Sequence, residues 1–592
     1  MLKSSSGLRA ILYGLGALVL LAALHAVFWF DRGRHHLVNH RNLADQFLNF
    51  GEVWLALLMV GLALPAALLL SGTLGVVFGR FVSRFERWLT GRASLLALGV
   101  LAALGSFLIA HFVHDYAWFT DDEQAYLYQA KCYLHGTLTG EVLEPRAALE
   151  HSFVVPVGEG GAQRLAGVYP VLQPLLMSLG MRLGNPNLSQ FLMVLLVVYN
   201  SARFAQQLLG SRRAGFITGA LCATSPMLLG LASTYHTAVL ATALTVISGR
   251  VFLFLERHPG LFSGAALGAV AGSIVLARPM EGTLVVVMLG VALSVWTIRR
   301  GRRAVGVSVT AMLGYGLGGL LPLGVFLAVN YGTTGSWLAG PYKVLEAQIG
   351  GFFGFGDGMM WGRTHSPAHG LTQTISALFR MNNWLFAWPI SLVVPGLALL
   401  RGLRNSKTTA LLLVSVVQLS AYFFLAFGSV HDFGSAYHVW HLPIMATCTA
   451  WVVLRLSEHL KNHWPQSAKA PYWIAAGLTV AGLLTFWPAQ LLRWQTVGEL
   501  ITGPVRAAEH AAGSEPAVVL WSSIQPPRTG IRSWVFRAPA PHSNDSVIWA
   551  RDHKAFLPGL RNNFPNRQFF RLSWSGSEPV IHPVSLKAKT PQ

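Results

Sequence analysis

Three adjacent carboxylates stand out in a chain that is otherwise poor in charge. Asp121, Asp122 and Glu123 follow a long apolar run, and the whole chain of 592 residues contains only 24 acidic residues. A carboxylate at a membrane surface could deprotonate an incoming hydroxyl while a lipid-borne leaving group waits beside it. These residue types therefore indicate general-base chemistry at the end of a membrane segment.

The same residues also fit a structural role. Tyr126, Ala130 and Tyr133 recur at helical spacing, which predicts a helix that begins at the carboxylates. Thr120 and Glu123 match a capping box, and acidic groups are stabilised at the N-terminus of a helix. Capping requires one or two of these groups and not three, so both interpretations stay open.

The composition identifies the chain as a polytopic membrane protein. It is 53% hydrophobic and 11% charged, whereas soluble proteins carry about a quarter charged residues. Uncharged apolar runs of about 18 residues or more are typical of transmembrane helices. About 13 such spans are predicted, at 10–30, 53–79, 93–113, 188–209, 214–232, 236–255, 260–277, 282–298, 304–330, 383–400, 408–427, 438–456 and 472–491.

The basic residues predict which ends of these spans face the cytoplasm. The net charge of +20 comes mostly from arginines and lysines in short loops between apolar runs, so it reflects membrane orientation and not nucleic-acid binding. This arrangement places two long loops, 114–187 and 331–382, and the tail from 492 on the outer face. The basic loop at 32–41 is the exception, since it also falls outside.

The sequence divides into three parts. Residues 1–92 are expected to form N-terminal membrane helices, 93–491 a membrane core, and 492–592 a periplasmic tail. Within the tail, short β-like runs such as EPAVVLW and SVIWARD predict a small α/β domain over about 515–575. The predicted fold is an all-α polytopic membrane protein with a small α/β C-terminal extracytoplasmic domain.

The outer segment and three later segments resemble a known family. The pattern D-E-x-x-Y-x-x-x-A-x-x-x-x-x-G is formed by Asp122, Glu123, Tyr126, Ala130 and Gly136. It resembles the first outer loop of the GT-C glycosyltransferases, integral membrane enzymes that include the protein O-mannosyltransferases and the aminoarabinose transferase of lipid A. The later segments that are similar to this family, in the usual order, are 167–180, 276–282 and 362–392. The resemblance covers about 115–445.

This resemblance implies an activity, a location and a base. It implies inverting transfer of a sugar from a polyprenyl-phosphate donor to a glycan, lipid or protein acceptor, on the periplasmic side of a bacterial inner membrane. The first aspartate of the family's pair is the base, which points to Asp122, with Asp121 as the rival because TDDE can be aligned either way. Glu123 and Tyr126 would be structural or would orient the acceptor. No cofactor is expected and, since no outer loop carries a D-x-D pair, no metal.

Arg278 is the main candidate for holding the donor phosphate. It is a lone arginine on the outer side between two predicted spans. A cation there could offset the charge that develops on the leaving group. The alternatives are a salt bridge to Glu281 or a side chain that snorkels to the membrane surface.

Three histidines are further candidates for binding the phosphate or sugar. His236 lies at the outer end of a predicted span, where an ordinary helix-end role is the alternative. His365 and His369 have the i, i+4 spacing of a zinc pair, but Pro367 and the nearby glycines favour a loop that lines a pocket. The glycine-dense stretch 350–363 is expected to form a mobile outer loop over the site.

The segment around His441 departs from the family pattern. Ala436, Tyr437 and His441 stand where relatives carry an Arg-Tyr pair and an acidic residue. The departure removes a cation and a carboxylate, which His438 or His441 could replace. It keeps open a second hypothesis, a non-catalytic protein that binds a lipid-linked sugar. The third hypothesis is a lipid or sugar transporter. Charges in the middle of spans would favour it, but nearly all charges lie at span ends.

Overall fold

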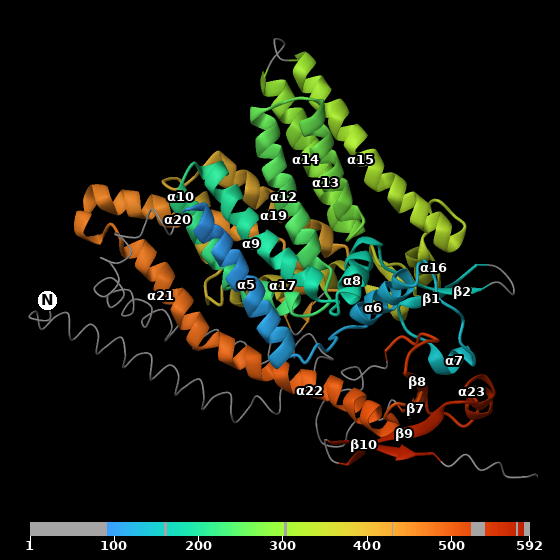
Figure 1. The fold of residues 1–592 in the computed structure, drawn as a ribbon. Coiled ribbons are helices and arrows are strands. Elements are labelled where there is room, and N and C mark those ends of the chain that lie inside the picture. Colours follow the sequence, from blue (N-terminus) through green and yellow to red (C-terminus); the bar gives the residue numbers. More distant parts are fainter. Residues whose placement is uncertain are drawn as a thin grey trace, which may run out of the picture.

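A bundle of long apolar helices forms the body of the molecule (Figure 1). The computed structural model describes residues 91–158, 163–300, 305–428, 430–431, 433–522, 539–575 and 578–584. Within these ranges, seven helical segments are long and apolar enough to cross a membrane, or eight if one bent pair counts as a span. They are α5 (Arg92–Phe112), α9 (Leu188–Leu209), α12 (Ala238–Arg257), α14 (Pro279–Arg300), α15 (Val305–Thr334), α19 (Ser406–Phe423), and α21 (Ala470–Leu484) taken together with α22 (Phe486–Ala512). The chain is thus a multi-pass membrane protein.

The predicted number of about 13 spans is not confirmed. The first two predicted spans lie outside the described residues. The span predicted over 383–400 is wrong, because α17 (Pro367–Trp384) ends there and only the short turns α18 (Val393–Gly396) and η5 (Leu397–Leu399) follow. Pro389 and Pro395 interrupt this run, since proline cannot donate the backbone hydrogen bond that a helix interior needs. Its apolar side chains, such as Trp388, instead fill the protein core.

The span predicted over 214–232 is broken in the middle. It consists of α10 (Arg212–Ala223) and α11 (Pro226–Ala232), whose axes differ by 55°. Ser225 caps the second helix, because its hydroxyl accepts a hydrogen bond of 3.3 Å from the Leu228 amide, and Pro226 occupies the first helical position. A fresh cap and a proline at this point start a new helix rather than continue the old one.

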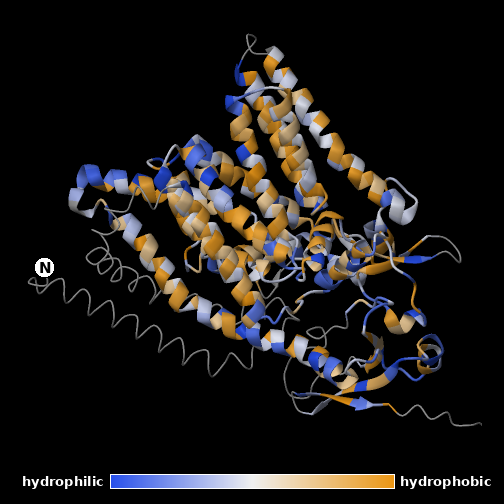
Figure 2. Cartoon of the chain, viewed as in Figure 1, coloured by the Kyte–Doolittle hydropathy of each residue, from blue (hydrophilic) through white to orange (hydrophobic). Residues whose placement is uncertain are grey.

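Two helices approach each other through glycines. α13 (Leu261–Val275) packs along α15, and both are largely apolar in Figure 2. A Cβ atom at Gly268 would lie 2.0 Å from the Tyr315 carbonyl oxygen, and one at Gly318 would lie 2.0 Å from the Ala265 carbonyl oxygen. Small residues of this kind let membrane helices pack backbone to backbone. The chain passes from α13 directly into the turn that carries Arg278.

A layer of short elements covers one end of the bundle. α6 (Asp121–Leu134) lies at its centre, and the 331–382 segment packs against it through an apolar cluster that includes Ala125, Leu345 and Phe352. The other elements of this layer are α7 (Arg146–Leu149), β1 (Val154–Val157), β2 (Arg164–Gly167), α8 (Leu172–Arg182), α16 (Pro341–Ile349), β3 (Gly356–Met359), η4 (Met360–Gly362), β4 (Arg363–His365), β5 (Val430–His431), β6 (Gly434–Ser435) and η6 (Ala436–His438). The chain then returns to the bundle as α20 (His441–His463) and the short turn η7 (Pro465–Ser467).

The tail forms a four-stranded sheet, which we call the C-terminal unit (residues 517–584). Its elements are β7 (Ala517–Trp521), β8 (Val547–Arg551), α23 (Leu557–Asn563), β9 (Gln568–Ser575) and β10 (Glu578–Pro583). The strand order is β10-β9-β7-β8, with β7 parallel to both of its neighbours. The central strand β7 is buried on both faces, by α22 on one side and by α7 and α23 on the other. The two predicted β-like runs therefore do form strands.

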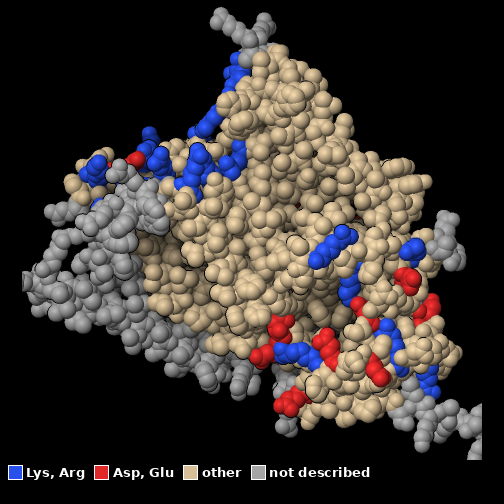
Figure 3. Space-filling model, in the orientation of Figure 1, with Lys and Arg blue, Asp and Glu red and all other residues tan. Residues whose placement is uncertain are grey.

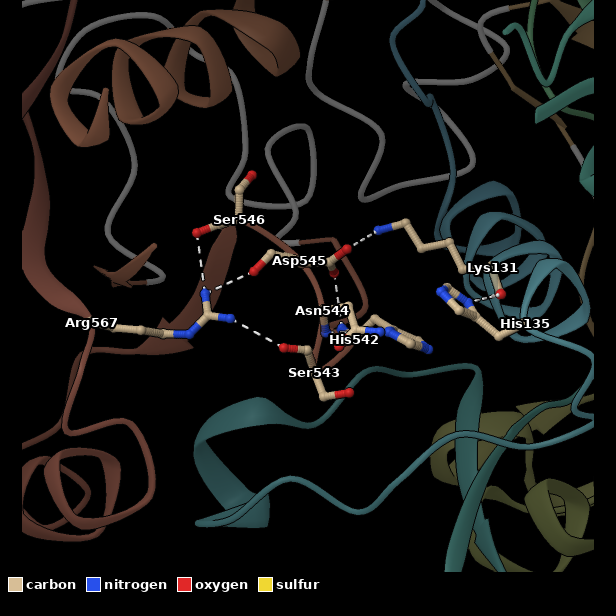
Figure 4. A network of polar contacts seen from close by, with 8 residues as sticks. All are labelled: Lys131, His135, His542, Ser543, Asn544, Asp545, Ser546 and Arg567. Carbon is tan, nitrogen blue, oxygen red and sulfur yellow. Dashed lines mark hydrogen bonds and ion pairs between the residues drawn. The ribbon is translucent and has the colours of Figure 1, made fainter. Parts of the chain in front are cut away.

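A polar network fixes the C-terminal unit to α6 (Figure 4). The Lys131 ammonium on α6 donates to one oxygen of the Asp545 carboxylate, and the His542 amide donates to the other over 2.9 Å. The His135 ring stacks on the His542 ring with centroids 5.3 Å apart. Arg567 holds the same loop, since it donates to the Asp545 carbonyl oxygen over 2.7 Å. α6 is therefore bound on one side by the membrane core and on the other by the tail.

Candidate functional site

The three carboxylates at the start of α6 lie in different surroundings. The Thr120 hydroxyl caps the helix by accepting from the Glu123 amide over 3.4 Å. The Glu123 carboxylate is fully buried and accepts from the Phe119 amide over 3.1 Å. The capping interpretation thus accounts for Glu123, which faces inward. It does not account for Asp122.

Asp122 is the carboxylate that reaches the surface of this layer. Asp121 is buried, with 7% of its surface exposed, whereas Asp122 is only partly buried. The Tyr169 hydroxyl forms a hydrogen bond with the Asp122 carboxylate. Tyr169 lies just before α8 and also packs edge-on against Tyr126, with ring centroids 4.6 Å apart. Among the three acids, Asp122 has the position that a base needs.

Arg278 occupies the tight turn between α13 and α14. The turn can close because residue 282 is glycine, where a Cβ atom would lie 2.4 Å from the Val275 amide nitrogen. The Nε atom of Arg278 donates to the Glu281 carboxylate, and the guanidinium carbon lies 4.6 Å from the centre of the Tyr437 ring. Within the described chain, Nη1 and Nη2 make no hydrogen bond. The salt bridge between Arg278 and Glu281 therefore forms, and it leaves the Nη1 and Nη2 atoms available to another ligand.

Glu281 holds this arginine from behind. Its carboxylate is buried and accepts a second hydrogen bond, from the Tyr422 hydroxyl on α19. A carboxylate with two donors on it is fixed in place, and so is the guanidinium it binds. Glu281 therefore fixes the position of the Arg278 guanidinium, which can still bind a second anion.

Three tyrosines lie near enough to both Asp122 and Arg278 to interact with their charges. Tyr126 on α6, Tyr342 on α16 and Tyr437 on η6 each interact electrostatically with both charged groups. Burial raises the pKa of the Tyr126 and Tyr437 hydroxyls well above the usual value for tyrosine, so both remain protonated donors at neutral pH. None of the three hydroxyls makes a hydrogen bond to another described residue. The arrangement can therefore offer several N–H and O–H donors to one anion beside a carboxylate.

His438 and His441 differ in how close they lie to Arg278. His438 is next to the Arg278 guanidinium, and its ring meets the Tyr422 ring edge-on at 4.8 Å between centroids. His441 lies behind it, with ring centroids 5.6 Å apart, and is completely buried against Trp440. The predicted phosphate ligand His441 is thus placed one layer behind the site, and His438 is the nearer of the two.

The other predicted histidines have contacts of their own. His236 is buried in the turn between α11 and α12, where its ring accepts from the Ala238 amide over 3.3 Å, as a helix-end residue does. The His365 ring stacks on Phe355, and the His369 ring lies 2.8 Å from the Gln373 amide nitrogen. In the described ranges, no group of three or more His, Cys, Asp or Glu side chains could hold a metal ion.

Sequence reasoning missed most of the tyrosines. Tyr169, Tyr342 and Tyr422 received no role, because tyrosines near span ends are usually interfacial anchors. Tyr437 was noticed only as part of an altered motif. Their common signal is position, since each lies in or beside a segment that the topology places at the same end of the bundle as Asp122. Only the folded arrangement shows that they share one site.

Comparisons with known proteins identify the fold. No family model matches the chain, and no curated protein matches it in sequence. The structure of ArnT from Cupriavidus metallidurans bound to undecaprenyl phosphate is similar, with 12% sequence identity, a TM-score of 0.51, and coverage of 83% of this chain and 99% of that one. An oligosaccharyltransferase from Archaeoglobus fulgidus tethered to an acceptor peptide matches with a TM-score of 0.36 at 12% identity, over 83% of this chain and 70% of that one. The likeness to ArnT confirms the expected GT-C type of fold.

Proposed function

We propose that this chain is an integral-membrane glycosyltransferase that moves a sugar from a polyprenyl-phosphate donor to an envelope acceptor. One observation carries the proposal: the Asp122 carboxylate and the Arg278 guanidinium both interact electrostatically with the same three tyrosine hydroxyls, and Arg278 lies against the Tyr437 ring. Displacement of a phosphate from a sugar carbon requires a base for the acceptor hydroxyl and a cation for the leaving phosphate. The ArnT structure, which contains undecaprenyl phosphate, supports a lipid-phosphate donor.

The reaction follows from the two ends of the site. Asp122 takes the proton of an acceptor hydroxyl as that oxygen attacks the anomeric carbon of the donor sugar. The bond from that carbon to the phosphate oxygen breaks, and its electron pair leaves with the polyprenyl phosphate. Attack from the side opposite the phosphate inverts the anomeric carbon. The proton ends on Asp122, and the added negative charge ends on the phosphate.

Arg278 would stabilise the departing phosphate. The leaving group gains charge as the bond breaks, so a fixed donor pair favours the transition state over the ground state. Glu281 holds Nε, which leaves Nη1 and Nη2 to form a two-pronged contact with phosphate oxygens. The Tyr126 and Tyr437 hydroxyls can add neutral donors to the same group.

The charge distribution supports a periplasmic site. Figure 3 shows lysines and arginines, with few acidic residues, at the helix ends distant from the C-terminal unit. They include Arg212 and Arg213 at the start of α10 and Arg299 and Arg300 at the end of α14. Basic loops favour the cytoplasm, which would place α6 and the C-terminal unit on the periplasmic side of a bacterial inner membrane.

The test is a rescue experiment in the native host. The chromosomal copy is deleted and replaced by wild type, Asp122→Asn or Asp121→Asn at matched membrane levels. We expect Asp122→Asn to lower transfer by about 10²- to 10⁴-fold, the usual worth of a general base, and to accumulate a sugar-linked polyprenyl phosphate. Asp121→Asn, with the same change in charge at the neighbouring position, should keep most of the transfer.

The outcomes separate the alternatives. Wild-type envelope glycans in both variants would refute the role of Asp122. Photo-crosslinking of a polyprenyl-phosphate sugar to the wild type without any turnover would identify a non-catalytic binder instead. The lost glycan, read by mass spectrometry, would name the sugar and the acceptor.

A further inference from the structure

The second half of α9 carries a polar stripe inside a membrane span. The stripe consists of Tyr199, Asn200, Arg203, Gln206 and Gln207. Their spacing places them on one side of the helix. Polar and charged residues at such positions are costly in a bilayer and mark a site where they have a partner. The transferase site does not use them, since it lies at the other end of the same helix.

Arg250 on α12 joins the stripe from the neighbouring helix. Its Nη1 atom donates to the Asn200 side-chain oxygen, and its guanidinium lies 6.0 Å from the centre of the Tyr199 ring. Arg203 donates to the Gln206 side-chain oxygen over 2.7 Å. Asn200, which Arg250 binds, lies one turn before Arg203 on α9, so the two positive charges are neighbours and repel one another. Two like charges are therefore held together between α9 and α12.

Neither arginine has a counter-charge in the described chain. All of their hydrogen-bond partners there are neutral, and the Nε atoms of both are buried without a hydrogen bond. Glu256, near the end of α12, lies instead among Lys407, Arg257 and Arg300. Repulsion between these partly buried like charges and their partial loss of hydration both oppose this arrangement. An anion from outside the chain would remove both costs.

We propose that Arg203 and Arg250 bind the phosphate of an anionic phospholipid in the leaflet opposite Asp122. Arg203 lies six residues before the end of α9 and Arg250 seven before the end of α12, about 10 Å along the axis. Arginine side chains can span part of that distance toward a headgroup. Their planar forks suit phosphate oxygens, which accept two hydrogen bonds at once.

The surroundings favour a lipid over free phosphate. Phe204, Leu208 and Val246 pack into a buried apolar cluster that flanks the pair. Phe254, one turn beyond Arg250 on α12, is exposed and suits contact with an acyl chain. At the end of α9, the Lys407 ammonium donates to the Leu208 carbonyl oxygen over 2.6 Å and adds a third cation near the membrane surface. Basic pockets between membrane helices on the cytoplasmic side are known to select anionic headgroups.

The test compares lipid retention by the purified full-length protein. Wild type, the double variant Arg203→Gln/Arg250→Gln and the control Arg257→Gln are placed in nanodiscs of phosphatidylcholine, with or without phosphatidylglycerol. They are then transferred to detergent, and retained phosphatidylglycerol is counted by native mass spectrometry. Arg257 is a matched control because it is an exposed arginine on the same helix. We expect the double variant to bind about thirtyfold more weakly, the factor for two arginine–phosphate contacts.

Each outcome decides the proposal. Equal retention in all three proteins overturns it, as does displacement of the lipid by inorganic phosphate, which would identify a site for free phosphate. The single variant Arg250→Gln guards against misfolding of the double. When no anionic lipid is present, Arg250→Gln removes the repulsion between Arg203 and Arg250, so the melting temperature of this variant should rise in phosphatidylcholine alone. With phosphatidylglycerol present, the wild type should gain more stability than this variant, and an equal gain would count against the site. The result does not depend on whether the protein transfers a sugar.

Discussion

Asp122 and Arg278 interact electrostatically with the same three tyrosines, although Asp122 lies in the first turn of α6 and Arg278 lies in the turn between α13 and α14. The Nε atom of Arg278 donates to Glu281, and its Nη1 and Nη2 atoms make no hydrogen bond to any residue that the structure describes. The acid and the cation are therefore arranged to act on one molecule between them. Three predictions concern how this arrangement is held together, and one concerns its chemistry.

The chemical prediction is that Arg278→Lys loses activity although the charge is kept. A lysine presents one nitrogen, which cannot bind Glu281 and a phosphate in two separate directions. Loss of a charged hydrogen bond predicts a fall of about 10- to 100-fold in kcat/KM for the donor. Because charge grows on the leaving phosphate, kcat should fall by more than KM rises.

The matched control for this prediction is Arg363→Lys. Arg363 is exposed in the same outer layer, where its guanidinium lies 5.7 Å from the centre of the Trp361 ring. It should keep wild-type kinetics. An equal loss in both variants would point to general damage of the layer, and unchanged kinetics in Arg278→Lys would remove the phosphate contact from the mechanism.

The sequence predicts the membrane class better than it predicts the individual spans. Long apolar runs without proline, such as that of α9, have the boundaries that their composition indicates. The run over 383–400 looks equally apolar, but its first part, Trp384 to Trp388, is buried in the protein core, and hydropathy cannot separate burial in protein from burial in lipid. The prolines within it were the available signal.

The site shows the same limit. Asp122 and Arg278 could be named as candidates because charges are rare near membrane segments and each has few possible roles. Tyr342 and Tyr437 could not, since their role depends on contacts between α16, η6 and α6 that no local pattern records. The sequence also suggested that charges avoid the span interiors, and Arg203 and Arg250 are exceptions to this.

The contact between α13 and α15 should tolerate no added methyl group at its centre. Gly268→Ala would place a carbon 2.0 Å from the Tyr315 carbonyl oxygen, and overpacking of this kind costs about 1–3 kcal/mol. We expect a lower melting temperature in detergent and weaker donor binding, because α13 leads into the Arg278 turn. Gly316→Ala on α15 is the control, since its Cβ meets nothing within 4 Å. Equal melting temperatures for the two variants would contradict the close packing.

The link between α6 and the C-terminal unit should weaken when Asp545 loses its charge. Asp545→Asn removes the ion pair with Lys131 but keeps the local loop contacts that Arg567 makes to backbone oxygens (Figure 4). A partly exposed pair contributes up to about 1 kcal/mol, so α6 amides should exchange with deuterium up to about fivefold faster. Asp552→Asn breaks an ion pair with Arg571 within the sheet and leaves α6 untouched. Equal changes in the deuterium exchange of α6 amides in both variants would contradict a stabilising contact between Asp545 and α6.

Glu123 should make the stability of the protein depend on pH. Burial raises the pKa of its carboxyl from 4.5 to about 8, although the Phe119 amide favours the charged form. The folded state therefore holds the proton more tightly than the unfolded state does. Its contribution to stability is complete below pH 4.5 and is lost as the pH rises through about 8. We expect the melting temperature in detergent to fall across this window.

Glu123→Gln should remove that dependence. The glutamine oxygen can still accept from the Phe119 amide, but the side chain cannot ionise, so its melting temperature should stay level where the wild type declines. Glu141→Gln, at an exposed acid beyond the end of α6, should decline like the wild type. A parallel decline in Glu123→Gln would assign the effect to another group. Because the substitution keeps the cap and leaves Asp122 in place, transfer activity should survive it, and this would separate the carboxyl that supports the helix from the carboxylate that we propose as the base.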